Sequence, residues 1–332
     1  MTVVRTSSGR QFDIADGESV LDAALRADIG LSYSCRTGRC GTCKGQIRSG
    51  KTVPTHHELG LDEAELAAGW ILTCVRTAES DVELEIEDLG DVQLFHPRTL
   101  PCRIHALERL SQDVIKVVLR LPPASNFDFH CGQYIEVIGH AALRRSYSIA
   151  NAPTPDKHIE LHISHVPGGA MSKYWFDQAK VNDLLRLNGP LGTFFLRDID
   201  GLDLVFLATG TGIAPVKAIM EGMRQRTEPH GARSVSIFWG GRVEGDLYWD
   251  ARNAGSEHSY MPVLSRASSS WSGARGHVQQ AALAQTRDWS RTAVYACGSE
   301  AMIHSARLQL LDAGLNARRF LSDAFVCSAA AA

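Results

Sequence analysis

Four cysteines constrain the fold and chemistry of this chain more than any other feature. Cys35, Cys40 and Cys43 lie in one short segment, and Cys74 follows in the sequence Ile-Leu-Thr-Cys-Val. This C-x4-C-x2-C…C spacing is the ligand pattern of a plant-type [2Fe–2S] cluster. Two bridged irons need four thiolates in a small volume, so one tight loop supplies three of them and a distant strand the fourth. We therefore expect these cysteines to hold a cluster that passes single electrons.

A structural zinc site and a disulfide scaffold are the alternative interpretations of these cysteines. A zinc site usually pairs C-x2-C with a second C-x2-C or a pair of histidines, and the sequence offers no second pair. Disulfides suit small secreted proteins, whereas this chain has 332 residues and begins without the basic and apolar segments of a secretory signal. The spacing favours the cluster over both alternatives.

Length and composition predict a protein of two or three globular domains. The apolar fraction of 44% is ordinary for globular proteins. The sequence has no long uncharged apolar run, so we expect no membrane span and a cytoplasmic location.

The charge of the chain is unevenly divided. Residues 1–92 contain nine Lys and Arg against sixteen Asp and Glu, whereas the rest contains twenty-five against twenty-one. Much of the acidity lies in residues 79–91, where Val82, Leu84 and Ile86 alternate with glutamates and predict a half-buried strand with an acidic face. That face is either solvated or a docking surface for a basic partner, and its charge disfavours nucleic acid.

The pattern of apolar residues and turn signals divides the chain into three segments. The first contains short strands at 2–6 and 11–15, a helix capped by Ser19, and a polar helix at 62–68. Residues 95–101 contain two prolines and are expected to be a linker. The second segment has strands at 114–120, 134–138, 145–150 and 158–166, which suggest an antiparallel barrel. The third alternates apolar strands, at 204–208, 234–239, 261–264 and 293–296, with helices, which suggests a parallel sheet.

The second segment carries the sequence Arg-Arg-Ser-Tyr-Ser at residues 144–148, which alone reads as an ordinary strand. Arg145, Tyr147 and Ser148 fit the Arg-x-Tyr-Ser flavin motif, and here the chain resembles the ferredoxin–NADP reductase superfamily. The resemblance implies that Arg145 binds the FAD pyrophosphate and that the ring of Tyr147 lies on the isoalloxazine. It also implies that Ser148 is a catalytic residue near the flavin N5, where hydride arrives.

Two glycine-rich turns are expected to bind the phosphates of the cofactors. Gly169 and Ser172 precede a helix expected from about Lys173, and the resemblance implies that they bind the FAD pyrophosphate; an ordinary capped turn is the alternative. In the third segment, a strand, a glycine turn and a helix start follow one another at residues 207–215. There Gly210, Thr211, Gly212 and Pro215 match the Gly-Thr-Gly-x-x-Pro motif of the superfamily, which implies binding of the nicotinamide dinucleotide.

Residues near the C-terminus complete the predicted site. The resemblance implies that Cys297 and Gly298 lie beside the nicotinamide, with Cys297 as a second catalytic residue, although Ser299 stands where the superfamily usually has proline. Phe325 resembles the C-terminal aromatic residue that shields the flavin. Without the resemblance, core packing is the commoner role for a residue such as Cys297 or Phe325. After Trp239, the segment 240–246 holds one arginine and two carboxylates, which favours NADH over NADPH.

The cluster, flavin and nucleotide motifs follow one another along the whole chain in an order similar to that of the iron–sulfur flavoprotein reductases. We expect a β-grasp ferredoxin domain at 1–94, an antiparallel β-barrel FAD domain at 98–198 and an α/β parallel-sheet NAD domain at 201–327. Electrons are expected to pass from NADH to FAD, to the [2Fe–2S] cluster and to a partner protein. Residues 145–153 and 322–325 are similar to CDP-6-deoxy-Δ3,4-glucoseen reductases of deoxysugar biosynthesis, which implies a sugar dehydratase as partner. The alternative is the reductase component of a multicomponent mono- or dioxygenase, of the kind that serves phenol hydroxylases.

Two further functions stay open on the sequence. A ferredoxin-like carrier or redox sensor needs only the first domain and leaves the flavin and nucleotide motifs without a role. A flavin reductase that releases reduced flavin needs the second and third domains and leaves the cluster without one.

Overall fold

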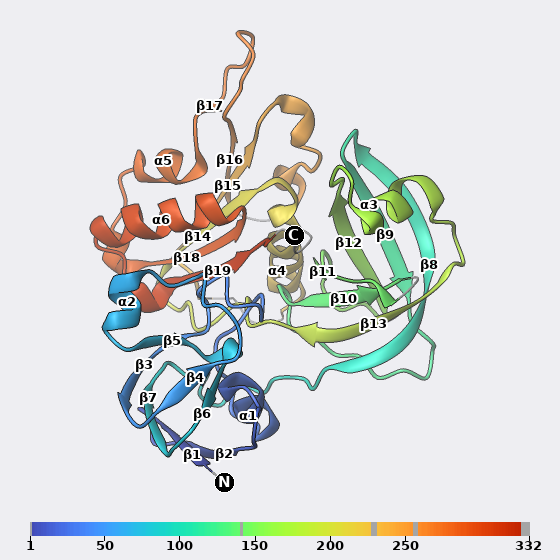
Figure 1. Cartoon of the computed structure of the whole chain (residues 1–332). Helices are drawn as coiled ribbons and strands as arrows, with labels where there is room; N and C mark the ends of the chain where they lie inside the picture. The colour runs from blue at the N-terminus through green and yellow to red at the C-terminus, as the bar shows by residue number, and fades with distance from the viewer. Residues whose placement is uncertain (1, 140–141, 227–230, 255–257, 327–332) are drawn as a thin grey trace. The chain divides into compact units, whose positions relative to one another are not determined.

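The computed structural model describes residues 2–139, 142–226, 231–254 and 258–326 (Figure 1). The chain divides into two compact units, the first ending at Phe95 and the second running from His96 to Phe325. Residue 327, the predicted end of the third domain, lies outside the described residues. Among the described residues, no helix combines the length and the apolar character that a membrane span requires.

The first unit is built on a five-stranded mixed sheet in the order β2-β1-β7-β3-β5. Its strands are β1 (Thr2–Thr6), β2 (Gln11–Ile14), β3 (Lys44–Ser49), β5 (Trp70–Leu72) and β7 (Val82–Glu85). The helices α1 (Val20–Arg26) and α2 (Glu63–Ala67) and a small two-stranded sheet, β4 (Thr52–Pro54) with β6 (Arg76–Ala78), complete it.

Local sequence signals explain the helices and the acidic strand of this unit. The hydroxyl of Ser19 accepts a hydrogen bond from the Asp22 amide and caps α1, as predicted. Asp62 forms a capping box with Glu65 at the start of α2. In β7, Val82 and Leu84 are buried while the glutamates between them face solvent, so the predicted half-buried strand with an acidic face is confirmed.

The second unit begins with a six-stranded barrel whose neighbouring strands all run antiparallel, in the order β11-β10-β13-β8-β9-β12. A bridge between Ile149 and Leu161 joins the two ends of this order. The strands are β8 (Arg98–Ser111), β9 (Val114–Arg120), β10 (Tyr134–Ile138), β11 (Arg144–Ser148), β12 (His158–Ser164) and β13 (Leu184–Leu191). The helix α3 (Ala170–Lys173) and a π-helical turn, η3 (Tyr174–Gln178), follow β12.

The predicted linker at 95–101 is wrong in its second half, because β8 begins at Arg98. Residues Arg98 to Pro101 pair with β13, whereas pairing with β9 on the other side starts at Arg103. Pro101 therefore lies where β8 has a partner on one side only, and its missing N–H costs no ladder hydrogen bond. The last strand of the barrel, β13, ends with Gly189–Leu191.

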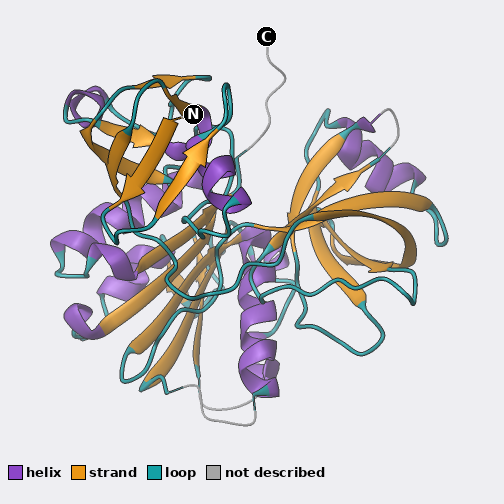
Figure 2. Ribbon diagram, turned by 90° about the horizontal axis from the view of Figure 1, so that it is seen from below, coloured by secondary structure: helices purple, strands orange, loops and turns teal. Residues whose placement is uncertain are grey.

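The rest of the second unit is a parallel sheet in the order β17-β16-β15-β14-β18-β19. Helix α4 covers one face and helices α5 and α6 the other (Figure 2). The strands are β14 (Asp203–Thr209), β15 (Ser234–Gly241), β16 (Ser259–Leu264), β17 (Ala274–Arg275), β18 (Thr292–Gly298) and β19 (Phe320–Ala324); the helices are α4 (Ile213–Gln225), α5 (Val278–Leu283) and α6 (Glu300–Asp312). Both β14 and β18 are buried along almost their whole length, as a sheet covered on both faces requires.

The strand order places the nucleotide motifs at one edge of this sheet. The chain moves from β14 outward to β15 and later returns to β18 on the other side of β14, so the order reverses between β14 and β18. Ligands of open parallel sheets bind at the carboxyl ends of the strands at such a reversal. The turn after β14 is η4 (Gly210–Gly212), and Cys297 and Gly298 end β18.

Candidate functional site

The pairing of two strands brings the fourth cysteine to the other three. Cys43 directly precedes β3, and Cys74 lies in a 3-10 turn, η1 (Thr73–Val75), directly after β5. Because β3 and β5 are antiparallel with Lys44 opposite Leu72, the residues flanking this pair meet. The amide and the hydroxyl of Thr73 each lie 3.1 Å from the carbonyl oxygen of Cys43, to which they donate.

The four thiols interact in two pairs, Cys35 with Cys40 and Cys43 with Cys74. A hydrogen bond from the Cys40 thiol lowers the pKa of Cys35 to about 4 and raises that of Cys40. In the second pair, a hydrogen bond from Cys43 lowers the pKa of Cys74 and raises that of Cys43. No three His, Cys, Asp or Glu side chains of the described residues are grouped as ligands of a single metal ion. Two pairs of thiols suit a cluster of two irons held by four cysteines.

Backbone groups of the loop point at the cysteine sulfur atoms. The amide nitrogens of Thr37 and Cys40 each lie 3.4 Å from the sulfur of Cys35. Gly38 has a φ of +73°, and a Cβ atom there would lie 2.4 Å from the carbonyl oxygen of His57. The loop therefore needs glycine at this position, and its amides can stabilise negative charge on the sulfurs.

A buried ion pair, which sequence reasoning missed, anchors the segment that packs on this loop. The carboxylate of Glu58 is only 4% exposed and lies 2.7 Å from Nη2 of Arg76. It also accepts a hydrogen bond of 2.7 Å from the Leu72 amide, two residues before Cys74. The Gly60 amide donates to the carbonyl oxygen of Gly38 at 2.9 Å. Glu58 thus ties the cluster loop to the strand end that carries Cys74.

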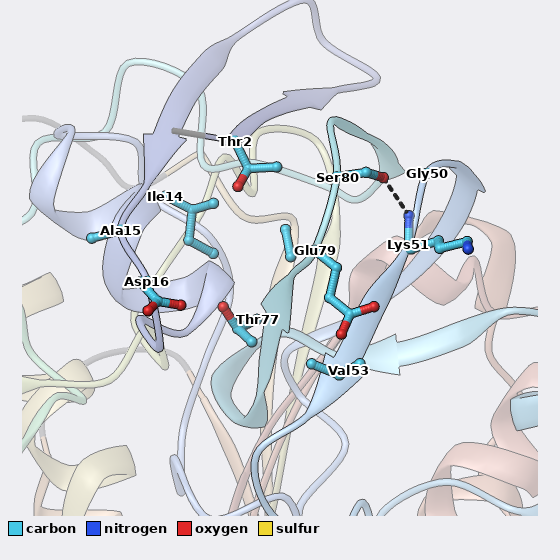
Figure 3. Close-up of a pocket in the computed structure, with 11 residues that line it drawn as sticks. Thr2, Ile14, Ala15, Asp16, Gly50, Lys51, Val53, Thr77, Glu79 and Ser80 are labelled. Atoms are coloured by element: carbon cyan, nitrogen blue, oxygen red, sulfur yellow. Dashed lines mark hydrogen bonds between the residues drawn. The ribbon is translucent and has the colours of Figure 1, made fainter.

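An open groove in the first unit contains none of the predicted site residues (Figure 3). The six residues of β3, about 20 Å of extended chain, separate its Gly50 from Cys43. The Lys51 amide donates to the hydroxyl of Ser80 across it, at 2.9 Å. Its lining consists of Thr2, Ile14, Ala15, Asp16, Gly50, Lys51, Val53, Thr77, Ala78, Glu79 and Ser80.

Two residues of the predicted flavin motif share one face of β11. Arg145 and Tyr147 are half-buried, whereas Arg144 and Ser146 on the other face are exposed. Nε1 of Trp175 donates to the Tyr147 hydroxyl at 2.9 Å, and the two rings meet edge-on. Burial raises the pKa of Tyr147 to about 12, so the phenol stays protonated. This face presents a guanidinium and an aromatic ring held in place, which suits a pyrophosphate and a flavin ring.

The predicted pyrophosphate turn at Gly169 and Ser172 has a different local structure from the expected one. The helix begins at Ala170 and not near Lys173, with Gly169 as its N-cap. Ser172 therefore lies inside the helix, where its hydroxyl accepts a hydrogen bond of 2.9 Å from the Val166 amide. This bond closes the loop after β12, so the first helical turn forms ahead of the serine.

The predicted nucleotide turn forms between β14 and α4, as expected. Gly210 has a φ of +54° and is exposed, whereas Thr211 and Pro215 are buried. A Cβ atom on Gly212 would lie 2.3 Å from the carbonyl oxygen of Cys297, so this position must be glycine for the two strand ends to approach. Within the motif, Gly210 is the residue open to a dinucleotide phosphate.

Ser148 and Cys297 meet at a carboxylate that sequence reasoning missed. Oδ2 of Asp323 lies 3.4 Å from the Ser148 hydroxyl oxygen and 3.9 Å from the sulfur of Cys297. All three side chains are buried, and burial raises the pKa of the Cys297 thiol well above its usual value. Asp323 lies opposite Cys297 in the β18–β19 register, and a carboxylate within the short C-terminal strand that begins at Phe320 was the available signal.

Phe325 and Gly298 lie next to this group. The Phe325 amide donates to the carbonyl oxygen of Gly298 at 2.8 Å, and the ring packs half-buried against the core of the parallel sheet. Gly298 has a φ of +129°, and a Cβ atom there would lie 2.2 Å from the hydroxyl oxygen of Thr209. The amide of Ser299 donates to that same hydroxyl at 3.0 Å. Ser299 also caps α6 through its own hydroxyl, which gives this departure from the usual proline a structural role.

Each of the three predicted domains contains a segment that matches a known domain family. Residues 3–79 match the 2Fe-2S iron-sulfur cluster binding domain, residues 101–196 the oxidoreductase FAD-binding domain and residues 206–308 the oxidoreductase NAD-binding domain. Over 319 residues the chain is 42% identical to the CDP-6-deoxy-L-threo-D-glycero-4-hexulose-3-dehydrase reductase of Yersinia pestis, with 95% of each chain covered. The chain belongs to the iron–sulfur flavoprotein reductases.

This reductase is also similar to proteins from other systems. It is 31% identical to reductase component 2 of terephthalate 1,2-dioxygenase from Comamonas sp, over 95% of its own length and 94% of that chain. The crystal structure of the Amycolatopsis cytochrome P450 reductase GcoB covers 98% of the reductase, with a TM-score of 0.77 and 29% identity. Its domain families make the reductase an NAD(P)H-dependent oxidoreductase with FAD and a [2Fe–2S] cluster, and the predicted three-domain fold class is confirmed.

Proposed function

We propose that the chain takes electrons from NADH and delivers them one at a time to a partner protein. FAD accepts a two-electron hydride and releases electrons singly, and the [2Fe–2S] cluster passes them on. The observation that supports this most is the meeting of Ser148 from the flavin barrel with Cys297 and Asp323 from the nucleotide sheet. These three buried side chains join the strands whose residues we propose would hold the flavin and the nicotinamide.

Each group of predicted site residues has a proposed role in this scheme. Arg145 and the turn at Gly169 and Ser172 bind the FAD pyrophosphate, Tyr147 supports the flavin ring, and Phe325 covers it. Gly210, Thr211, Gly212 and Pro215 shape the turn that takes the dinucleotide phosphates, and Gly298 leaves room for the nicotinamide. Cys35, Cys40, Cys43 and Cys74 are the cluster ligands. Asp323 holds the Ser148 hydroxyl in place through its hydrogen bond.

We propose NADH as the reductant because carboxylates occupy the end of β15. The carboxylate of Asp246 accepts hydrogen bonds from the amides of Arg242 and Val243, at 2.7 and 3.2 Å. Glu244 is exposed, and its carboxylate accepts a hydrogen bond of 3.2 Å from the hydroxyl of Ser268. Negative charge here repels a 2′-phosphate. We expect a higher kcat/KM for NADH than for NADPH, and an increase in NADPH use on Glu244→Gln; equal use of the two by the wild-type chain contradicts the proposal.

A CDP-sugar dehydratase is the partner we propose, and the hydroxylating component of an oxygenase is the alternative. The chain is 42% identical to the Yersinia pestis dehydrase reductase and 31% identical to the terephthalate dioxygenase reductase component. A cytoplasmic location suits both partners, and none of the seven described cysteines forms a disulfide, which fits a reducing compartment.

Replacing one cluster ligand tests the route of the electrons. Cys40→Ser should remove the visible and paramagnetic signals of the cluster and abolish NADH-driven electron delivery to a protein acceptor. Ferricyanide reduction, which the flavin performs directly, should remain within about twofold of wild type. Cys131→Ser, in the second unit, is the matched control and should change neither activity. Undiminished delivery to a protein acceptor by Cys40→Ser contradicts the relay.

Coupled assays test the partner, run anaerobically with the sugar dehydratase and in the presence of O2 with the dioxygenase component. The wild-type reductase and NADH are mixed with a purified CDP-6-deoxy-hexulose-3-dehydrase and its sugar substrate, or with an aromatic-ring dioxygenase component. Sugar turnover at a rate that depends on the reductase supports the proposal. Turnover with the oxygenase component alone makes the chain an oxygenase reductase.

A further inference from the structure

Strand β12 of the barrel presents one polar face to the nucleotide sheet. Side chains alternate along a strand, and Ile159, Leu161 and Ile163 fill the barrel core. The residues between them, Glu160, His162 and Ser164, form what we call the β12 outer face. Each of these three contacts a different part of the nucleotide domain, although the sequence analysis assigned no role to any of them.

His162 is the most buried member of this face. Its side chain is 2% exposed, with Nε2 2.8 Å from a carboxylate oxygen of Glu160 and Nδ1 3.2 Å from the hydroxyl oxygen of Tyr248. Burial lowers the pKa of His162 and raises that of Tyr248. With these partners, the imidazole of His162 is neutral. Its Nε2–H donates a hydrogen bond to the carboxylate of Glu160, and its Nδ1 accepts one from the hydroxyl of Tyr248.

Contacts continue from His162 to the nucleotide turn. The ring of Tyr248 meets the ring of Trp239 edge-on, with centroids 5.1 Å apart. Trp239 is fully buried, and its Nε1 donates to the carbonyl oxygen of Gly210 at 2.9 Å. The hydroxyl oxygens of Ser164 and Thr211 lie 3.2 Å apart, so a second member of the β12 outer face bonds to the same turn.

The third member, Glu160, fixes helix α4, which starts at this turn. Nζ of Lys217 lies 3.1 Å from Glu160, 2.7 Å from Glu221 and 2.9 Å from the carbonyl oxygen of Ala150. The carboxylate of Glu221 accepts a hydrogen bond of 3.0 Å from the Ala152 amide. Both alanines closely follow the flavin strand β11, so α4 is held to the end of that strand as well as to β12.

We propose that His162 is a positioning residue that sets the distance between the nucleotide turn and the flavin strand. It touches neither cofactor. It acts through Tyr248 and Trp239 on Gly210, and through Glu160 on α4. The proposal rests on the proposed hydride transfer at Ser148 and Cys297, and it adds that the nicotinamide is placed by a buried polar contact built into the barrel.

The physical reason is that hydride transfer is sensitive to small displacements. A shift of about 1 Å between reacting groups can cost about a hundredfold in rate. Loss of the imidazole leaves the buried Tyr248 hydroxyl without its partner and leaves Glu160 with Lys217 alone. Such groups move to find new partners, and the turn that Trp239 supports moves with them.

Anaerobic stopped-flow reduction of the FAD-loaded reductase by NADH tests this role. His162→Gln keeps a donor for Glu160 but has no acceptor at the position of Nδ1 for the Tyr248 hydroxyl, and Tyr248→Phe removes that hydroxyl alone. His165→Gln, an exposed histidine that follows β12, is the matched control. We expect the flavin reduction rate at saturating NADH to fall about 10- to 100-fold in His162→Gln. The double variant, His162→Gln with Tyr248→Phe, has no buried hydroxyl without a partner and should recover part of this loss. The control, His165→Gln, should match wild type.

Two further readouts distinguish the positioning role of His162 from a merely structural one. The deuterium isotope effect with C4-deuterated NADH should rise in His162→Gln, because the hydride step then limits the rate, while thermal stability and FAD content of the double variant stay near wild type. Two results overturn the proposal. One is a wild-type reduction rate in both His162→Gln and Tyr248→Phe.

The other is a rise in the KM for NADH alone, with the saturating rate unchanged. If His162→Gln fails to fold, Tyr248→Phe alone decides between these outcomes. Absence of flavin reduction by NADH in the wild-type reductase overturns the proposed function itself.

Discussion

The hydroxyl oxygen of Ser148 lies 3.4 Å from a carboxylate oxygen of Asp323, although 175 residues separate them in the sequence. Ser148 ends a strand of the antiparallel barrel, and Asp323 lies in the last strand of the parallel sheet. The two folds of the second unit therefore share one buried hydrogen bond at the place where the proposed hydride transfer occurs. Four predictions rest on this contact and on other contacts described above.

Removal of the Ser148 hydroxyl is expected to slow flavin reduction without loss of the fold. Ser148→Ala should lower the rate of flavin reduction by NADH about 10- to 100-fold, because a hydrogen-bonding group at the reacting atoms is lost. Asp323→Asn should have a smaller effect in the same direction, since an amide oxygen can still accept from Ser148. Ser146→Ala, on the exposed face of the same strand, is the control. Stopped-flow absorbance measures each rate, and a wild-type rate in Ser148→Ala refutes this assignment.

A side chain at Gly212 is expected to destabilise the second unit. The Cβ atom of Gly212→Ala would lie 2.3 Å from the carbonyl oxygen of Cys297, so the ends of β14 and β18 must separate. The expected loss is about 1–3 kcal/mol in the free energy of unfolding, with weaker NADH binding. Gly245→Ala, which has no atom within 4 Å of the new Cβ, should be neutral. Denaturant unfolding followed by flavin fluorescence measures the difference, and equal stability of the two variants contradicts the prediction.

The buried ion pair of the first unit is expected to stabilise the cluster loop. Glu58→Ala leaves the guanidinium of Arg76, which is 15% exposed, without its carboxylate partner and frees the Leu72 amide. The expected cost is about 3–5 kcal/mol, the usual range for breaking a buried pair. Cluster absorbance should therefore be lost at a lower denaturant concentration. The exposed Glu87→Ala serves as the comparison, and the prediction fails if both variants lose the cluster at the same concentration.

Stability of the second unit is expected to fall in acid in two steps. Burial lowers the pKa of His162 in the folded state, so its contribution is present above the unfolded value of 6.5 and is lost as the pH falls below it. Burial alone would raise the pKa of Glu160, but the hydrogen bond from His162 and the charge of Lys217 lower it to about 2. That contribution is present above 4.5 and is lost as the pH falls toward 2.

The slope of unfolding free energy against pH measures these steps. Each group should add up to about 1.4 kcal/mol per pH unit to the slope of the unfolding free energy, within its own pH range. His162→Gln should flatten the slope just below pH 6.5, and Glu160→Gln should flatten it below pH 4.5. Unchanged slopes in both variants would show that other groups govern the acid sensitivity.

Regular strands with clear turns were predictable from the sequence, and strands that depend on distant partners were not. The prediction for 114–120 and 134–138 matches β9 and β10 residue by residue, because alternation and turn signals bound both strands. Strand β8 was missed since Pro101 reads as a linker until one knows that only one side of the strand is paired there. Helix α3 begins early because Val166 bonds to Ser172, a contact that local propensity does not reveal.

The motifs of the site were predictable, but the residues that join them were not. The segment with Cys35, Cys40 and Cys43, the predicted flavin strand and the glycine turn are each short and local, so their spacing predicts them; Cys74 was predicted from the long-range C-x4-C-x2-C…C pattern. Asp323 and His162 matter through contacts with residues far away in the chain, Ser148 and Tyr248 among them. Such contacts exist only once barrel and sheet are packed together, and no periodicity in the sequence encodes them.

The flavin strand β11 pairs along its length with β10, and among the described residues no strand pairs with its other side before Ile149. On this unpaired side, the guanidinium of Arg145 donates a hydrogen bond to the carbonyl oxygen of Arg144. Main-chain groups of this edge can therefore bond to partners other than a strand. Main-chain groups are the same in every amino acid. A cofactor that binds partly to the main chain of such an edge does not depend on the exposed side chains of Arg144 and Ser146. These two side chains can therefore change during evolution to suit a new partner while the proposed flavin site stays the same.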